Sequence, residues 1–169
     1  LLSRGLGDVY KRQEKELINS IIKEIRTRKD YLKNKKLSSI YFGGGTPSII
    51  STHLIKKILK NISEEFIITD NTEITIETNP DDITKKKLDD YFNIGINRLS
   101  IGIQSFDDEI LKSLNRSHNA MQAKNSIEIA INSRIKNISV DIMFNLPNQG
   151  LTKLCLLYTS DAADEGHCV

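Results

Sequence analysis

Hydrophobic residues recur along this chain with two different periods. In some segments they lie three and four residues apart, with charged residues between them, which predicts amphipathic helices. Shorter segments are rich in β-branched or aromatic residues and end at turn-forming residues, which predicts strands. The expected elements, in chain order, are a helix over 14–32, a strand over 38–42, a helix over 51–66, a strand over 73–78, a helix over 84–92, a strand over 97–104, a short helix over 107–114, a helix over 120–133 and a strand over 137–143.

This alternation of strands and helices defines the expected fold class. Successive βα units imply right-handed crossovers and a parallel sheet, so the class is α/β. Four strands in about 140 residues are too few for a closed eight-stranded barrel. An open or partial (β/α) barrel and a flavodoxin-like sheet both remain compatible with the pattern. The chain ends soon after the fourth strand, so we expect a domain that is truncated.

A glycine-rich stretch directly follows the first predicted strand. Its sequence is Tyr41-Phe42-Gly43-Gly44-Gly45-Thr46-Pro47-Ser48. Consecutive glycines weaken a strand, but they allow positive φ angles and let the backbone approach a ligand closely. Pro47 ends the strand pairing, and Ser48 or Ser51 is expected to cap the next helix. Taken alone, the glycines fit an ordinary β–α turn as well as a ligand-binding loop. A P-loop is not indicated, because no Lys-Ser/Thr pair follows at the required spacing.

Polar residues occur near the carboxyl end of each predicted strand. Because these ends meet at one edge of a parallel sheet, we expect them to line one cleft. Each residue alone also fits a surface position or a cap. Asp141 lies between two apolar residues, so we expect a buried carboxylate that needs a partner. The candidate residues are Gly43, Gly44, Gly45 and Thr46 after the first strand, Glu77, Thr78 and Asn79 at the second, Gln104 and Ser105 at the third, Asp141 and Asn145 at the fourth, and Arg116 after the short helix.

The chemistry of this set matches one kind of ligand. Carbonyl and carboxylate oxygens would bind an ammonium group, and an arginine would bind a carboxylate as a fork. An aspartate would bind a ribose diol. A ligand with an ammonium, a carboxylate, a ribose and an adenine would use the whole set. A nucleotide sugar or an amino acid remains an alternative.

Composition and charge narrow the function classes only a little. The chain has 24 basic and 22 acidic residues, a formal net charge of +2, which does not indicate nucleic-acid or membrane binding. No apolar run approaches the roughly 20 residues of a membrane span. We therefore expect a soluble, cytoplasmic protein.

The two ends of the chain are related through their coding DNA. Residues 8–13 can be encoded by GAT GTG TAT AAG AGA CAG. The reverse complement, read from its second base, encodes the Cys-Leu-Leu-Tyr-Thr of residues 155–159. This inverted repeat resembles the mosaic end of a transposon-based sequencing adapter, so we expect residues 1–13 and 155–169 to be adapter-derived. Both cysteines, Cys155 and Cys168, then lie outside the natural segment 14–154, which offers neither a disulfide nor a thiolate metal site.

Five motifs, in order, resemble one family. Together they are similar to the radical SAM family of oxygen-independent coproporphyrinogen III oxidases and their haem chaperone relatives. The resemblance spans about residues 36–149. Ser48, Asn79 and Ser105 stand where the haem chaperone branch has these residues, so they favour that branch over the oxidases. The motifs are Gly43–Ser48, Glu77–Pro80, Gly95–Asp107, Leu114–His118 and Asp141–Gln149.

The resemblance implies a partial (β/α) barrel with S-adenosylmethionine in its mouth. It places Gly44, Gly45 and Thr46 near the methionine moiety, Glu77, Gln104 and Arg116 on its polar groups, and Asp141 on the ribose, with Gly43 also among the cofactor-binding residues. His118 also matches a family position, where a structural histidine is as compatible as a ligand. The implied parent is a haem chaperone that binds S-adenosylmethionine and a [4Fe–4S] cluster and delivers haem. The alternative parent is a coproporphyrinogen III oxidase that decarboxylates a porphyrinogen.

The chain departs from the family at one decisive motif. The Cys-x-x-x-Cys-x-x-Cys triad that holds the [4Fe–4S] cluster is absent from this sequence. We therefore expect a fragment without catalytic residues or metal ligands of its own, which carries out no radical chemistry. A third hypothesis is an inert partial barrel with exposed strand edges.

Overall fold

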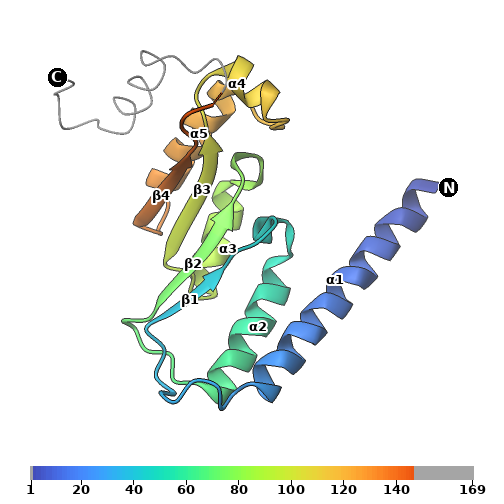
Figure 1. Cartoon of the computed structure of the whole chain (residues 1–169), viewed down its shortest axis with the longest axis vertical. Helices are drawn as coiled ribbons and strands as arrows, with labels where there is room; N and C mark the ends of the chain where they lie inside the picture. Colours follow the sequence, from blue (N-terminus) through green and yellow to red (C-terminus); the bar gives the residue numbers. More distant parts are fainter. Residues whose placement is uncertain (1, 147–169) are drawn as a thin grey trace.

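The structure, a computed structural model, describes the backbone of residues 2–146 and the side chains from residue 13 onward. Its centre is a parallel sheet of four strands in the spatial order β1-β2-β3-β4 (Figure 1). A flavodoxin-like sheet would interleave its first two strands in the order 2-1-3-4. The sequential order is that of a partial (β/α) barrel, so the first of the two expected arrangements is confirmed. The strands are β1 (Ser39–Phe42), β2 (Glu73–Thr78), β3 (Arg98–Gln104) and β4 (Asn137–Ile142).

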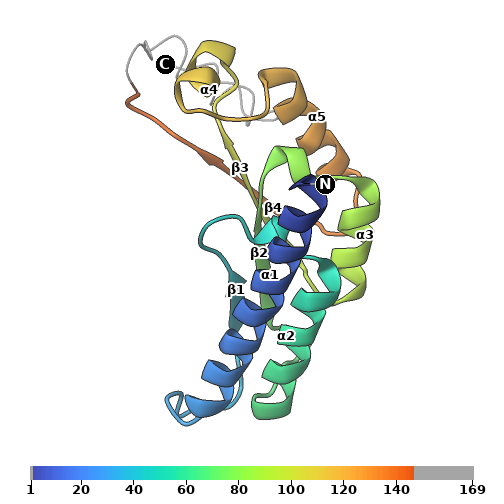
Figure 2. The ribbon, with the colours of Figure 1, turned by 90° about the vertical axis from the view of Figure 1, so that its right-hand side faces the viewer.

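The predicted helices all form, in the predicted order. They are α1 (Leu2–Thr27), α2 (Thr52–Glu65), α3 (Lys85–Asn93), α4 (Asp108–Ser113) and α5 (Ala120–Ile131), with two 3-10 turns, η1 (Pro47–Ile49) and η2 (Pro80–Asp82). Figure 2 shows α2, α3 and α5 on one side of the sheet, with α1 packed along α2. The other side of the sheet carries no helix in the described part of the chain.

The two faces of the sheet differ in polarity because side chains alternate along a strand. The helix-covered face is apolar, and it packs Ile76, Leu99 and Ile101 against Leu88 and Tyr91 of α3. The opposite face carries hydroxyl, carboxylate and guanidinium groups that bond to one another across the strands. These polar residues are Tyr41, Glu73, Thr75, Glu77, Arg98, Ser100, Ser139 and Asp141.

A second apolar cluster joins α1 to α2. Ile18 and Ile22 pack against Leu54 and Ile58. The prediction that the first helix reaches residue 32 was wrong, because α1 ends at Thr27. Beyond that point the apolar stripe has no surface to cover, and Tyr31 is 83% exposed.

The expected origin of the chain ends stays a prediction. Residues 2–13 continue the backbone of α1, a geometry that does not bear on where the segment comes from. Residues 155–169 lie outside the described residues, as do residues 147–149 at the end of the last motif. Within the described range, no helix combines the length and the apolar character needed to cross a membrane.

Candidate functional site

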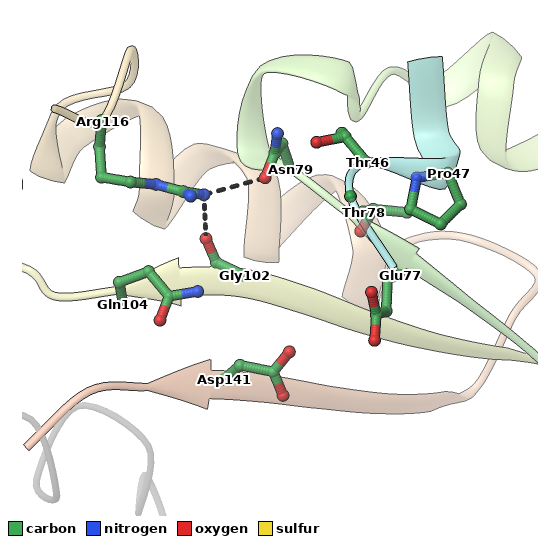
Figure 3. Close-up of a pocket in the computed structure, with 10 residues that line it drawn as sticks. Thr46, Pro47, Glu77, Thr78, Asn79, Gly102, Gln104, Arg116 and Asp141 are labelled. Carbon is green, nitrogen blue, oxygen red and sulfur yellow. Dashed lines mark hydrogen bonds between the residues drawn. The ribbon is translucent and has the colours of Figure 1, made fainter. Parts of the chain in front are cut away.

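A polar pocket lies at the carboxyl edge of the sheet (Figure 3). Its cavity measures about 190 Å³. Eight of the twelve candidate residues line it. Gly43 and Gly44 lie in the adjoining loop, and Ser105 and Asn145 are not part of the lining. The lining residues are Gly45, Thr46, Pro47, Glu77, Thr78, Asn79, Gly102, Gln104, Arg116 and Asp141. The expectation that the strand ends converge on one cleft is therefore confirmed.

The three glycines of the loop meet two different requirements. Gly44 and Gly45 have φ angles of +84° and +65°, in the region that favours glycine. A Cβ atom at Gly43 would lie 2.6 Å from the Tyr41 ring and 2.9 Å from Glu77 Oε1. Gly43 is therefore required by sterics, and the two glycines that follow it are required by backbone conformation.

Glu77 joins this loop to the second strand. Its Oε1 accepts a hydrogen bond of 2.9 Å from the Tyr41 hydroxyl, and its Oε2 accepts one of 3.1 Å from the Gly44 N–H. The hydrogen bond to Glu77 raises the pKa of Tyr41, and partial burial and the Glu77 charge act in the same direction. The carboxylate thus fixes the loop and also faces the pocket.

Arg116 reaches the pocket from the loop between α4 and α5. Its Nη2 donates hydrogen bonds of 2.9 Å to Asn79 Oδ1 and 2.8 Å to the Gly102 carbonyl (Figure 3). No carboxylate of the described residues forms an ion pair with it, so its charge is available to an anionic group. The flanking helices fix the loop, because Asp107 caps α4 and Asn119 forms a capping box on α5.

Gln104 ends β3 in an unusual backbone conformation. Its φ is +69°, and the pairing with β4 is irregular between Ile101 and Gln104. Its carbonyl accepts a hydrogen bond of 3.0 Å from the Met143 N–H. A non-glycine residue held in this region carries strain that clusters at functional sites, and here the strain directs the amide into the pocket.

Asp141 is held by a serine on the neighbouring strand. Ser100 Oγ lies 3.0 Å from each of its carboxylate oxygens. The prediction of a buried carboxylate was wrong, because Asp141 is exposed. The apolar neighbours of Asp141 face the helices, whereas Asp141 lies on the open face of a strand at the edge of the sheet. Asp141 does have a partner in Ser100, although its exposure removes the energetic need that burial would create.

The prediction that a serine caps α2 was also wrong. Ser48 is fully buried, donates to Asp82 Oδ2 at 2.5 Å and accepts from the Asn79 N–H at 3.3 Å. These bonds tie η1 to η2 beneath the pocket. Ser51 stands at the N-cap position of α2, but its side chain makes no capping bond.

The buried Nδ1 of His118 has no hydrogen-bond partner among the described residues, so the role of His118 stays a prediction. His118 is 3% exposed, and its Nε2 lies 3.1 Å from the Ile103 carbonyl. It does not line the pocket. The bond supports β3 one residue before Gln104.

Tyr41 and Ser100 bond to site residues, and Ser139 bonds to Ser100, but none of the three was among the residues predicted for the site. The alternation of β3 could have indicated Ser100, because it shares a face with Gly102 and Gln104. Tyr41 shares a face with Gly43 in the same way. Their partners depend on strand register, which pairs Ser100 with Glu77 on one side and with Ser139 on the other.

The described residues contain no group of three or more His, Cys, Asp and Glu side chains arranged for a metal ion. The two cysteines of the chain lie outside this range. The side chains that the structure describes therefore do not fit an iron–sulfur cluster.

The fold and the pocket define an α/β protein with a polar pocket at the carboxyl edge of a parallel sheet. The chain belongs to the Radical SAM superfamily, whose model matches residues 8–154. For the superfamily in general, membership implies S-adenosylmethionine and a [4Fe–4S] cluster.

Two relatives show which members of the superfamily the chain resembles. It is 41% identical over 135 residues to "Heme chaperone HemW" of Haemophilus influenzae, covering 80% of this chain and 35% of the relative. It is 38% identical over 143 residues to "Heme chaperone HemW" of Buchnera aphidicola subsp. Schizaphis graminum, covering 85% of this chain and 38% of the relative. The chain thus spans little more than a third of each relative.

One solved structure extends the likeness to the fold. Coproporphyrinogen III oxidase (HemN) from Escherichia coli, described as a Radical SAM enzyme, matches with a TM-score of 0.78 at 26% identity. The match covers 89% of this chain and 35% of that one. It supports the partial-barrel architecture.

Proposed function

We propose that the pocket binds S-adenosylmethionine and that the chain is part of a haem chaperone of the superfamily. The observation that supports this proposal is the combination of polar groups that line the pocket. Two carboxylates, two amides, one guanidinium and a glycine-rich backbone face a single cavity. This set is complementary to the ammonium, carboxylate and ribose groups of that ligand. The residues present therefore fit S-adenosylmethionine, although the described side chains do not fit the cluster.

Each group has a role under this proposal. Glu77 and the 43–46 loop bind the ammonium group, and Arg116 binds the carboxylate. Gln104 donates a hydrogen bond to the methionine moiety, and Asp141 accepts hydrogen bonds from the ribose hydroxyls. When bound, S-adenosylmethionine supplies the reactive group of the family's radical chemistry. The chain's own residues bind and orient it.

The size of the cavity limits the affinity of this chain alone. Ligand pockets usually enclose about 300–1,000 Å³, and this cavity of about 190 Å³ is smaller. It suits the polar ends of the ligand and leaves the adenine little enclosed. We expect a dissociation constant on the order of 0.1–1 mM.

Calorimetric titration of the chain with S-adenosylmethionine tests the site. We expect a single site that Asp141→Asn and Arg116→Ala each weaken. An equal titration with free methionine should give weaker binding, because the ribose contact is missing. Absence of any binding at several millimolar would falsify the proposed site.

The wider function comes from the relatives and needs the whole protein. Both relatives are named haem chaperones, which favours haem as the partner. A cytoplasmic location and the absence of nucleic-acid substrates stay predictions from the sequence. The alternative is a coproporphyrinogen III oxidase, which the likeness to the solved structure favours. Spectroscopic titration of a full-length protein with haem, beside an assay for decarboxylation of coproporphyrinogen III, separates the two. Fractionation of cells tests the location.

A further inference from the structure

A chain of hydrogen bonds runs across the open face of the sheet and ends in the pocket. Arg98 Nη2 donates to Ser139 Oγ at 3.3 Å, and Ser139 Oγ lies 3.2 Å from Ser100 Oγ. Ser100 Oγ then lies 3.0 Å from both oxygens of Asp141. This series of hydrogen bonds thus joins Arg98, at the start of β3, to the Asp141 carboxylate near the end of β4.

The direction of these hydrogen bonds follows from the chemistry at the two ends. A guanidinium group only donates, and an ionised carboxylate only accepts. Each serine hydroxyl between them accepts one bond and donates the next. Bonds aligned in this way polarise and strengthen one another. Arg98 is itself anchored, because its Nη1 lies 3.5 Å from Glu73 Oε1.

The shortest hydrogen bond of the series joins Ser100 to Asp141, next to the pocket. Ser100 is 4% exposed, so its hydroxyl is held in place by the surrounding sheet. Its single proton is donated to one of the two carboxylate oxygens at a time, and this bond restrains the Asp141 carboxylate, which is otherwise exposed on an edge strand. Ser139 has a second acceptor, the Leu99 carbonyl at 3.3 Å. Its contribution to Asp141 is therefore the smaller one.

We propose that Ser100 is a positioning residue that orients Asp141 and so makes the pocket select a ribose over a deoxyribose. A vicinal diol requires two acceptor oxygens in a fixed plane, and a freely rotating carboxylate offers them only part of the time. This inference rests on the proposed binding of S-adenosylmethionine. It adds to that proposal a determinant of sugar specificity outside the pocket lining.

The test compares adenosine with 2′-deoxyadenosine as probes, both titrated calorimetrically into the full chain. We expect the wild type to bind adenosine about tenfold more tightly, the size expected for one well-placed hydrogen bond. Ser100→Ala should bring this ratio close to one, whereas Ser100→Thr, which keeps the hydroxyl, should restore it. The matched control is Ser63→Ala, an exposed serine of α2 whose hydroxyl donates to the Lys60 carbonyl at 2.7 Å and to no other group of the described residues.

The outcomes separate this inference from the proposed function. If Ser100→Ala binds both probes with the wild-type ratio, Ser100 does not orient Asp141, while the binding site itself stands. If the wild type binds neither the probes nor S-adenosylmethionine, the proposed function fails and the inference fails with it. If Ser100→Ala does not fold, Ser139→Ala tests whether these hydrogen bonds set the preference for adenosine over 2′-deoxyadenosine. It should lower the ratio by about twofold, and an unchanged ratio overturns the inference.

Discussion

The guanidinium of Arg116 and the amide of Asn79 share a hydrogen bond of 2.9 Å, although the two residues are 37 positions apart. The same nitrogen bonds to the Gly102 carbonyl at 2.8 Å. One side chain thus connects the α4–α5 loop to the ends of β2 and β3. Because these two bonds fix the guanidinium, a carboxylate that enters the pocket meets a donor already in place.

Arg116→Lys should weaken the binding of S-adenosylmethionine by about tenfold. Nη2 already donates to Asn79 and Gly102, and a lysine has no further donors held in place, such as Nη1 and Nε, for the ligand carboxylate. Adenosine lacks the carboxylate, so its affinity should change less than twofold. Calorimetric titration with both ligands measures the difference. Arg134→Lys is the control, since Arg134 lies away from the pocket and stacks on Phe92 at 3.9 Å. Equal losses of affinity for both ligands would show that Arg116 supports the fold and does not bind the ligand carboxylate.

Alanine substitutions at Gly43 and Gly44 should act through different physical causes. A Cβ at Gly43 collides with the Tyr41 ring and Glu77 Oε1, so Gly43→Ala should displace both side chains and weaken ligand binding at least tenfold. No atom lies within 4 Å of a Cβ at Gly44, but its φ of +84° should cost the alanine about 1–2 kcal/mol of stability. Urea denaturation and ligand titration on both variants separate the two effects. A Gly43→Ala protein with normal binding would mean that Glu77 does not contact the ligand.

The order of strands and helices could be predicted because hydrophobic periodicity follows local geometry. The gathering of polar residues at one edge could be predicted because parallel strands end together. Whether those residues bind S-adenosylmethionine stays a prediction, and so does the individual role given to each of them. Neither follows from the arrangement of the side chains alone.

Two local expectations failed for a common reason. Asp141 has apolar neighbours in sequence, but its exposure depends on where β4 lies in the sheet. Ser48 has the sequence setting of a helix cap, but its hydroxyl bonds to Asp82, a residue 34 positions away. Similarly, the pairing of Tyr41 with Glu77 depends on cross-strand register. Contacts of this kind are set by tertiary structure and leave no mark in a local window of sequence.

Ser48→Ala should destabilise the protein by about 1–3 kcal/mol, because it removes a partner from the part-buried Asp82 and from the Asn79 N–H. Urea denaturation should show a lower midpoint with an unchanged slope. Ser63→Ala, at an exposed position, should stay within about 0.5 kcal/mol of the wild type. If the two variants are equally stable, the bond between η1 and η2 does not contribute to folding.

Tyr91 should govern part of the loss of stability at high pH. Its side chain is fully buried, and its hydroxyl has no hydrogen-bond partner in the described part of the protein. Burial, and secondarily the charge of Asp82, raise the pKa of Tyr91 well above its usual value of 10. The neutral phenol is therefore favoured in the folded state. The contribution of neutral Tyr91 to the free energy of unfolding is complete below about pH 10. It is lost as the pH rises from there toward the raised pKa of the folded state.

Tyr91→Phe should accordingly flatten the fall in stability between about pH 10 and pH 12. At pH 7 it should change stability by less than about 1 kcal/mol, because no protein hydrogen bond is lost. Thermal denaturation across this pH range, compared with the exposed control Tyr31→Phe, measures both effects. A loss of more than about 2 kcal/mol at pH 7 would show that the hydroxyl is hydrogen-bonded. An unchanged alkaline slope would assign the loss of stability to other groups.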